Sequence, residues 1–282
     1  MIGICVNHKY RAMEKQYIKT MSVHVKVEVL EELKLFYADL NKQFSAIDCM
    51  INQSERIFID LGYRHLKNMM GVMKLLEVHL TDLSIKIPLA AIFRSLTADA
   101  LTSEYFLALL TKDPDGILLR NEADCLMIEY CQAVNQILCN QKCIIRSSYF
   151  YNNQKECDKK RSDIHTAEGT PKYLQKGKFL SEATKLELIK DVWKTQTKVI
   201  VARKNYELNK YFSQYYHYNM AGGNIAQNYD IIEDVLSYEA IIYSLTGFSH
   251  SLNVIGKYFS SDLDKRVKKL CDSLSSKISI YD

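Results

Sequence analysis

The sequence has little glycine and little proline, with 10 glycines and three prolines among its 282 residues. Together they fall under half of the roughly 12% that these two residues reach in average proteins. So low a content excludes a collagen-like or low-complexity chain and argues against a β-rich fold built on many tight turns. Hydrophobic residues at 48% and charged residues at 25% are typical of a globular protein with a sizeable core.

The sequence also has little excess of one charge sign and no long apolar run that is free of charged residues. A net charge of +4 is too small to indicate a nucleic acid or a membrane as the partner. The most apolar segment, 88–110, contains Arg94, Asp99 and Glu104, and each charge costs about 2.5–3.5 kcal/mol near the centre of a bilayer. The apolar stretch at the N-terminus is too short for a signal peptide. The sequence therefore predicts a cytoplasmic protein without a membrane partner.

The eight cysteines indicate neither a disulfide framework nor a metal site. They are scattered through apolar sequence, which is typical of reduced thiols in a core. Five of them fall between 125 and 157, but Cys139 and Cys143 have helical spacing and no CxxC pair exists. Closed zinc sites usually have tighter ligand spacing. We expect reduced cysteines and no bound metal.

Motifs of several enzyme classes are absent as well. The chain contains no GxxxxGK[ST], HExxH, GxSxG or GxGxxG motif. It also lacks the Glu-x-x-His pairs with which helical bundles bind two iron ions. We therefore expect no nucleotide, zinc or di-iron cofactor, and no other cofactor is indicated.

The sequence does contain apolar residues at intervals of three and four, which is the period of a helix. The pattern predicts an all-α protein: a single domain, 1–282, formed by one bundle of about seven helices, several of them long. The third helix should be the most buried, Asp113–Gly116 should form a turn, and 151–178 should form an exposed, mobile loop. The expected helices are 23–51, 54–84, 88–111, 123–149, 181–217, 228–259 and 262–279.

Arg94 is the first candidate functional residue. It lies on a helix that is apolar on most faces, where an unpaired buried charge is very costly. Asp99 lies about 140° further round the helix and is a poor partner within it. Two interpretations follow: an ion pair to another helix, or contact of Arg94 and Asp99 with an anion or substrate.

A polar stripe near the end of the expected fifth helix is the second candidate. Its members are three and four residues apart, so they share one face: Arg203, Tyr206, Lys210, Ser213 and His217. A histidine beside a hydroxyl and a lysine has the parts for proton transfer next to an anion. Tyr216 and other nearby tyrosines offer stacking surfaces of the kind found in RNA-binding proteins. A solvated basic face is the alternative interpretation.

Two short segments carry a family resemblance. Ser213-Gln214-Tyr215-Tyr216-His217, together with the upstream Phe93-Arg94-Ser95-Leu96, resembles the Ser-x-x-x-His signature and apolar-helix arginine of an uncharacterised helical bacterial family. That family is similar to HEPN-type bundles, which include abortive-infection proteins and toxin RNases. The resemblance implies a role in phage defence or a toxin-type system. HEPN RNases have an arginine where this chain has Lys210, and lysine lacks the bidentate phosphate contact of arginine.

Three functions remain open at this point. The first is a helical regulatory or interaction protein whose polar stripe binds a partner chain. The second is a metal-independent, HEPN-like RNase in which His217 transfers protons, Arg94 or Lys210 holds phosphate, and Ser213 lies beside them. The third is a bundle that binds a small molecule. The corresponding partners are a protein, RNA, or a second copy of the chain in a homodimer.

Overall fold

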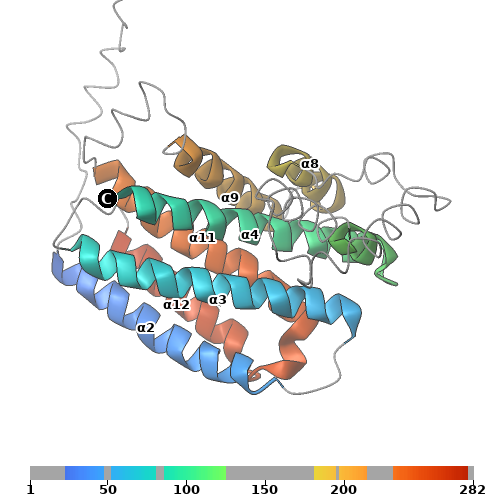
Figure 1. Ribbon diagram of the computed structural model, residues 1–282, viewed down its shortest axis with the longest axis horizontal. Coiled ribbons are helices and arrows are strands. Elements are labelled where there is room, and N and C mark those ends of the chain that lie inside the picture. Colours follow the sequence, from blue (N-terminus) through green and yellow to red (C-terminus); the bar gives the residue numbers. More distant parts are fainter. Residues whose placement is uncertain are drawn as a thin grey trace, which may run out of the picture.

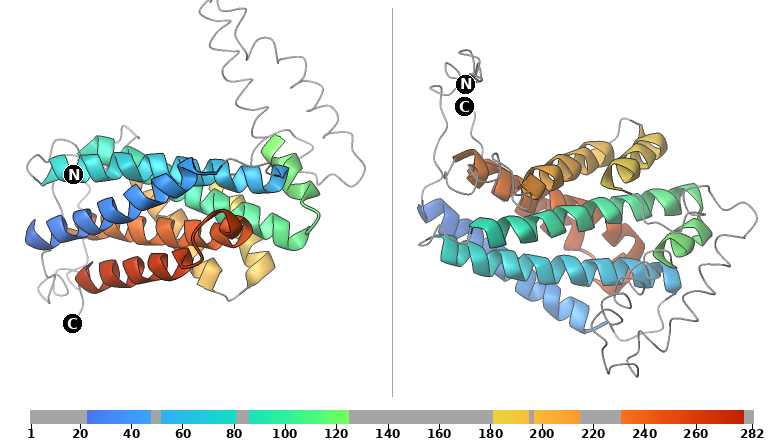
Figure 2. Two further views of the ribbon diagram at one scale, coloured as in Figure 1. Left: turned by 90° about the horizontal axis from the view of Figure 1, so that it is seen from below. Right: turned by 45° about the horizontal axis from the view of Figure 1, so that its top comes forward.

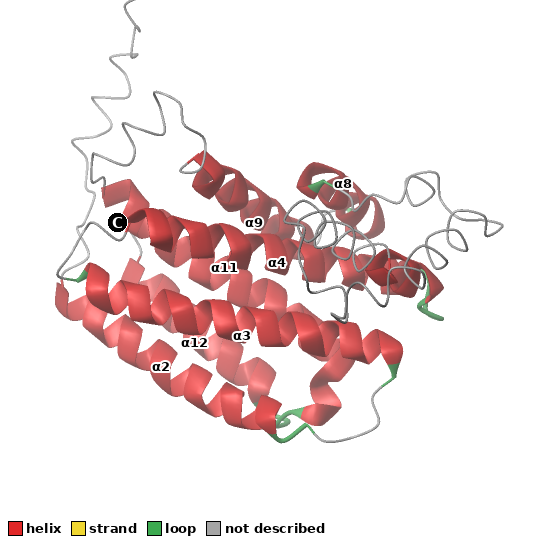
Figure 3. Ribbon diagram, viewed as in Figure 1, coloured by secondary structure: helices red, strands yellow, loops and turns green. Residues whose placement is uncertain are grey.

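The computed structural model describes residues 23–47, 52–80, 86–124, 181–194, 197–214 and 231–278. These residues are almost entirely helical and contain no strand, which confirms the all-α prediction (Figure 3). A short 3₁₀ turn at Gly256–Tyr258 links the last two helices, and residues 117–124 are also helical. The other helices are α2 (Val23–Ser45), α3 (Gln53–His79), α4 (Lys86–Lys112), α8 (Glu182–Trp193), α9 (Thr197–Ser213), α11 (Ile231–Ile255) and α12 (Leu263–Ile278).

Helices α4 and α11 lie in the middle of the bundle (Figure 1). Helix α4 contacts α3, α8, α9 and α11, and α11 contacts α3, α9 and α12 in addition. Helices α2 and α12 form one side of the bundle and α8 and α9 the other, as the two further views also show (Figure 2). The described helices thus share one apolar core, whose centre is α4.

The second half of α4 is the most enclosed part of the molecule. From Leu96 to Leu109 every residue except Ala98 is buried. Apolar residues on all sides of this helix explain its position, because each face meets another helix. The predicted burial of the third helix is therefore confirmed, although its first turns expose Ile87 and Arg94.

Local signals in the sequence mark the starts of several elements. The Asn52 side chain accepts a hydrogen bond of 2.8 Å from the backbone N–H of Glu55 and caps α3. Ser181 caps α8 in the same way. The turn at Asp113–Gly116 is present, and Gly116 has a φ of 71°, a conformation that favours glycine.

The expected continuous helix over 181–217 is wrong. The chain forms two helices here, because Lys194 has a φ of 47° and leaves the helical conformation. The break lets α8 and α9 run in different directions while Trp193 and Val199 on either side of it are both buried. Apolar spacing continues across the break, so periodicity alone could not locate it.

Other expected boundaries shift by a few residues. The first helix ends at Ser45 rather than near residue 51, and the second ends at His79 rather than near 84. Of the expected fourth helix, 123–149, only residues 123 and 124 are described, and they belong to a helix that begins at residue 117. The predicted loop at 151–178 lies outside the described residues.

Candidate functional site

The polar stripe and Arg94 lie where α4 meets the second half of α9. The Asn209 side chain donates a hydrogen bond of 2.9 Å to the backbone carbonyl of Arg94. One helical turn away, the rings of Phe93 and Phe212 stack with their centroids 5.1 Å apart. These two contacts fix the turn of α4 that carries Arg94 against the part of α9 that carries Lys210.

The stripe on α9 lies on the side expected from its spacing. Arg203 and Lys210 are exposed, and Tyr206 and Ser213 are half-buried. The Ser213 hydroxyl donates a hydrogen bond of 2.7 Å to the Asn209 carbonyl, so its proton is held by the helix backbone. The opposite side packs into the core through Val199, Val201, Ala202, Leu208 and Phe212. We call Arg94, Arg203, Tyr206, Lys210 and Ser213 the basic α9 face.

The expected burial of Arg94 is wrong. The residue is exposed, as is Ser95 beside it, because this part of α4 lies outside its fully enclosed second half. Arg94 therefore requires no buried partner to offset the cost of desolvation. Its exposed position beside α9 is compatible with contact to an anion.

Asp99 is one of two buried acidic residues on α4, together with Glu104. Its carboxylate accepts hydrogen bonds from Arg64 Nη2 at 2.8 Å, Arg64 Nε at 3.2 Å and Asn68 Nδ2 at 3.0 Å. Burial raises the pKa of Asp99, and the charges of Arg64 and Lys185 oppose that rise. Asp99 thus joins α4 to α3 rather than contributing to the basic α9 face.

Lys185 on α8 is a buried lysine that the sequence analysis missed. Its side chain is 2% exposed, and Nζ donates a hydrogen bond of 3.2 Å to the Thr102 hydroxyl. A weaker contact joins Nζ to Glu182 at 3.9 Å. The sequence could have indicated this burial, because Lys185 lies one helical turn before Ile189 on the side of α8 that faces the core.

Glu104 and His250 form a contact between α4 and α11 in which the glutamate is buried and the histidine is half-buried. His250 Nδ1 pairs with Glu104 Oε1, and the glutamate side chain is fully buried. Burial raises the pKa of Glu104, whereas the hydrogen bond and charge of His250 and the charge of Lys198 oppose that rise. The sequence analysis did not select this pair; a carboxylate in the most apolar part of the expected third helix was the signal.

His65 on α3 is a buried histidine with neutral partners. Its Nε2 lies 2.7 Å from the Tyr37 hydroxyl, and its ring stacks on Phe248 at a centroid distance of 4.6 Å. Burial lowers the pKa of His65 to about 3. The ring is therefore neutral at pH 7 and belongs to the core.

Two predicted site residues, Tyr216 and His217, lie outside the described residues. The structure therefore tests neither their positions nor the expected convergence of His217 with Arg94. Of the eight cysteines only Cys271 is described, and it is a free thiol. In the described ranges, no three His, Cys, Asp or Glu side chains are grouped so that they could hold a metal ion.

Comparison of the chain with protein-family models, with curated proteins and with solved structures found no match. The resemblance to HEPN-type bundles thus stays a prediction based on the residues quoted above. Among the described helices, none combines the length and the apolar character needed to cross a membrane.

Proposed function

We propose that this protein is a helical interaction protein with a regulatory role, and that its basic α9 face binds an acidic region of a partner polypeptide. The observation that carries the proposal is the exposure of Arg203 and Lys210 on α9, with Arg94 fixed beside them through Asn209. Exposed cations on a rigid element attract an acidic partner and orient it.

The surroundings of these cations support a protein partner over RNA. Proteins that bind single-stranded RNA present exposed aromatic rings on which bases stack. Tyr206 and Tyr211 are instead half-buried and pack against the core. A protein partner, which binds through complementary charge and shape and needs no exposed rings for stacking, fits this face better. The resemblance to abortive-infection proteins suggests phage defence or a toxin-type system as the setting.

A charge-reversal experiment tests the proposal. The full chain and an Arg203→Glu/Lys210→Glu variant are titrated with a fluorescent polyglutamate peptide and with mixed-sequence single-stranded RNA. We expect the peptide to bind and the variant to weaken binding about tenfold, with a strong dependence on salt. A Lys67→Glu/Lys74→Glu variant is the matched control, because both lysines are exposed on α3. Preference for RNA, or equal loss in both variants, would contradict the proposal.

A metal-independent RNase is the second candidate, and the contact between Asn209 and Arg94 favours it. The contact brings Arg94 to the helix that precedes His217 in the sequence, as phosphate binding beside a general acid or base requires. Purified protein incubated with mixed RNA should then cleave it with and without a chelator. Arg94→Ala and His217→Ala should each abolish cleavage, whereas Lys67→Ala should not. RNA that stays intact under all conditions excludes this candidate.

A further inference from the structure

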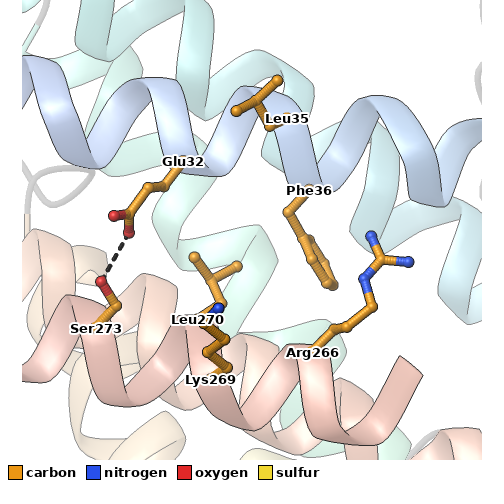
Figure 4. A pocket seen from close by; sticks show the side chains of 7 residues that line it. All are labelled: Glu32, Leu35, Phe36, Arg266, Lys269, Leu270 and Ser273. Atoms are coloured by element: carbon orange, nitrogen blue, oxygen red, sulfur yellow. Dashed lines mark hydrogen bonds between the residues drawn. The ribbon is translucent and has the colours of Figure 1, made fainter. Parts of the chain in front are cut away.

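A groove runs between α2 and α12 (Figure 4). These two helices lie on the side of the bundle away from α8 and α9 (Figure 1). The two helices are antiparallel, since Glu32 meets Lys277 while Asp39 meets Arg266. The groove has a volume of about 390 Å³. Side chains from both helices line it, and none of them belongs to the basic α9 face.

The floor of the groove is apolar. Phe36 and Leu270 are buried at its base, with 7% and 8% of their surfaces exposed. Leu35 stands at the rim and is 74% exposed, the largest exposure among the large hydrophobic residues described. An apolar side chain that entered the groove would cover Leu35 and contact Phe36, which removes apolar surface from water.

Within the part of the chain that the structure describes, most charged side chains at the groove form ion pairs, and one lysine does not. Glu32 accepts hydrogen bonds from Lys277 at 2.7 Å and from Ser273 at 2.9 Å (Figure 4 draws the latter). Arg266 donates to Asp39 at 2.8 Å and lies over the ring of Phe36. Lys269 has no carboxylate within 4 Å among the described residues, so one cation at the groove stays without an ion pair.

From this combination we infer that the groove binds an amphipathic helical segment of a partner protein, with apolar residues on one face and carboxylates along the flank. The apolar face would pack on Leu35 and Phe36, and a carboxylate would pair with Lys269. Of the five basic residues of α12, Arg266 and Lys277 are paired with carboxylates of α2. The exposed Lys269 is therefore the cation at the groove that a carboxylate of an acidic segment would complement. An amphipathic helix that lays its apolar face into a hydrophobic groove is a common mode of peptide recognition.

The experiment uses a fluorescent synthetic peptide with leucines at helical spacing and glutamates on the flanks. Matched peptides carry glutamine or lysine in place of glutamate. Binding to the full chain is followed by anisotropy, and hydrogen exchange locates the protected helices. We expect the glutamate peptide to bind most tightly and to protect α2 and α12.

Two variants of neighbouring lysines make the test specific. Lys269→Glu should weaken binding of the glutamate peptide about tenfold, whereas Lys268→Glu should change it less than about twofold. Lys268 is exposed on the side of α12 away from α2, so it controls for the charge of the helix. Leu35→Ser should weaken binding of all three peptides about fivefold. Far-ultraviolet circular dichroism verifies that each variant is folded.

Several results would overturn the inference. One is equal binding by wild type, Lys269→Glu and Leu35→Ser; another is equal binding of the glutamate and lysine peptides; a third is no saturable binding below about 1 mM. A dimer in sedimentation that Leu35→Ser dissociates would assign the groove to a second copy of the chain. Arg203→Glu/Lys210→Glu should leave this binding unchanged, so the groove and the basic α9 face can fail separately.

Discussion

His65 and His250, one buried and the other half-buried between the described helices, differ in the charge of their partners. His65 faces the Tyr37 hydroxyl and the ring of Phe248, which are neutral. His250 lies only two residues after Phe248 on α11, and it faces the carboxylate of Glu104. Because successive residues of a helix point about 100° apart, these two residues of α11 serve opposite sides of the bundle.

The difference teaches how the bundle accommodates polar groups between its helices. On the side of α2 and α3 a histidine is buried as a neutral ring, which fits a core of aromatic residues. On the side of α4 a carboxylate is buried, and the imidazole of His250 offers it a hydrogen bond. The partner, rather than burial alone, decides whether a charge is stabilised inside. Three predictions test this distinction.

Replacing Glu104 should have the largest effect. Glu104→Ala truncates a fully buried side chain, which leaves a cavity in the core and removes the hydrogen-bond partner of His250, so it should cost about 3–5 kcal/mol of unfolding free energy. Urea denaturation at pH 7 measures this loss. Glu104→Gln is the control, since its amide oxygen still accepts a hydrogen bond from Nδ1–H, and it should cost less. Similar losses in both variants would show that charge contributes little at this site.

The neutral state of His65 should be visible in the pH dependence of the unfolding free energy. The pKa of His65 is about 3 in the folded state and about 6.5 in an unfolded chain. Between these values only the unfolded state binds the proton, so the unfolding free energy falls as the pH falls from 6.5 to 3. From pH 7 to 4.5 the expected loss is about 2–3 kcal/mol.

His65→Phe is the comparison for this pH effect. The variant keeps an aromatic ring against Phe248 and has no proton to bind. Its urea-unfolding free energy should therefore decrease less than that of the wild type between pH 7 and 4.5. Parallel pH profiles for the two proteins would contradict a neutral His65 in the core.

The smallest effect is expected at the pair of Arg64 and Asp99, in which the carboxylate is buried and the guanidinium is exposed to water. The Arg64 side chain is 64% exposed while the Asp99 side chain is 11% exposed. Arg64→Ala should cost about 1–2 kcal/mol in thermal or urea unfolding, because Asn68 and water still serve the carboxylate. Arg56→Ala removes an exposed pair with Asp60 on the same helix, and should cost less than about 0.5 kcal/mol. Equal losses would mean that burial of Asp99 is irrelevant.

The fold could be predicted largely from the sequence because helical burial repeats along the chain. Leu33, Leu40 and Phe44 recur on one side of α2, and the enclosed second half of α4 is apolar on every side. The break at Lys194 could not be predicted in this way. It depends on the φ of a single residue, and the apolar spacing is helical on both sides of it.

The candidate site was predicted less completely. The spacing of Arg203 and Lys210 placed them on one face of a helix, and both are exposed on α9, because a shared face depends only on the geometry of one helix. The partners of Glu104 and Asp99 depend on which helices become neighbours, and periodicity carries no information about that. His250 pairs with a residue 146 positions earlier in the chain. The structure places that contact, and the sequence alone could not.

The central position of α4 also affects how the protein is made. Helix α4 ends at Lys112, whereas its neighbours α9 and α11 begin at Thr197 and Ile231. A ribosome adds about 5–20 residues per second, so the apolar surface that will meet these two helices waits on the order of ten seconds after α4 has been translated. We expect the nascent chain to need a chaperone during that interval, and chains truncated before α9 to aggregate. The core can close only when the last third of the protein has been synthesised.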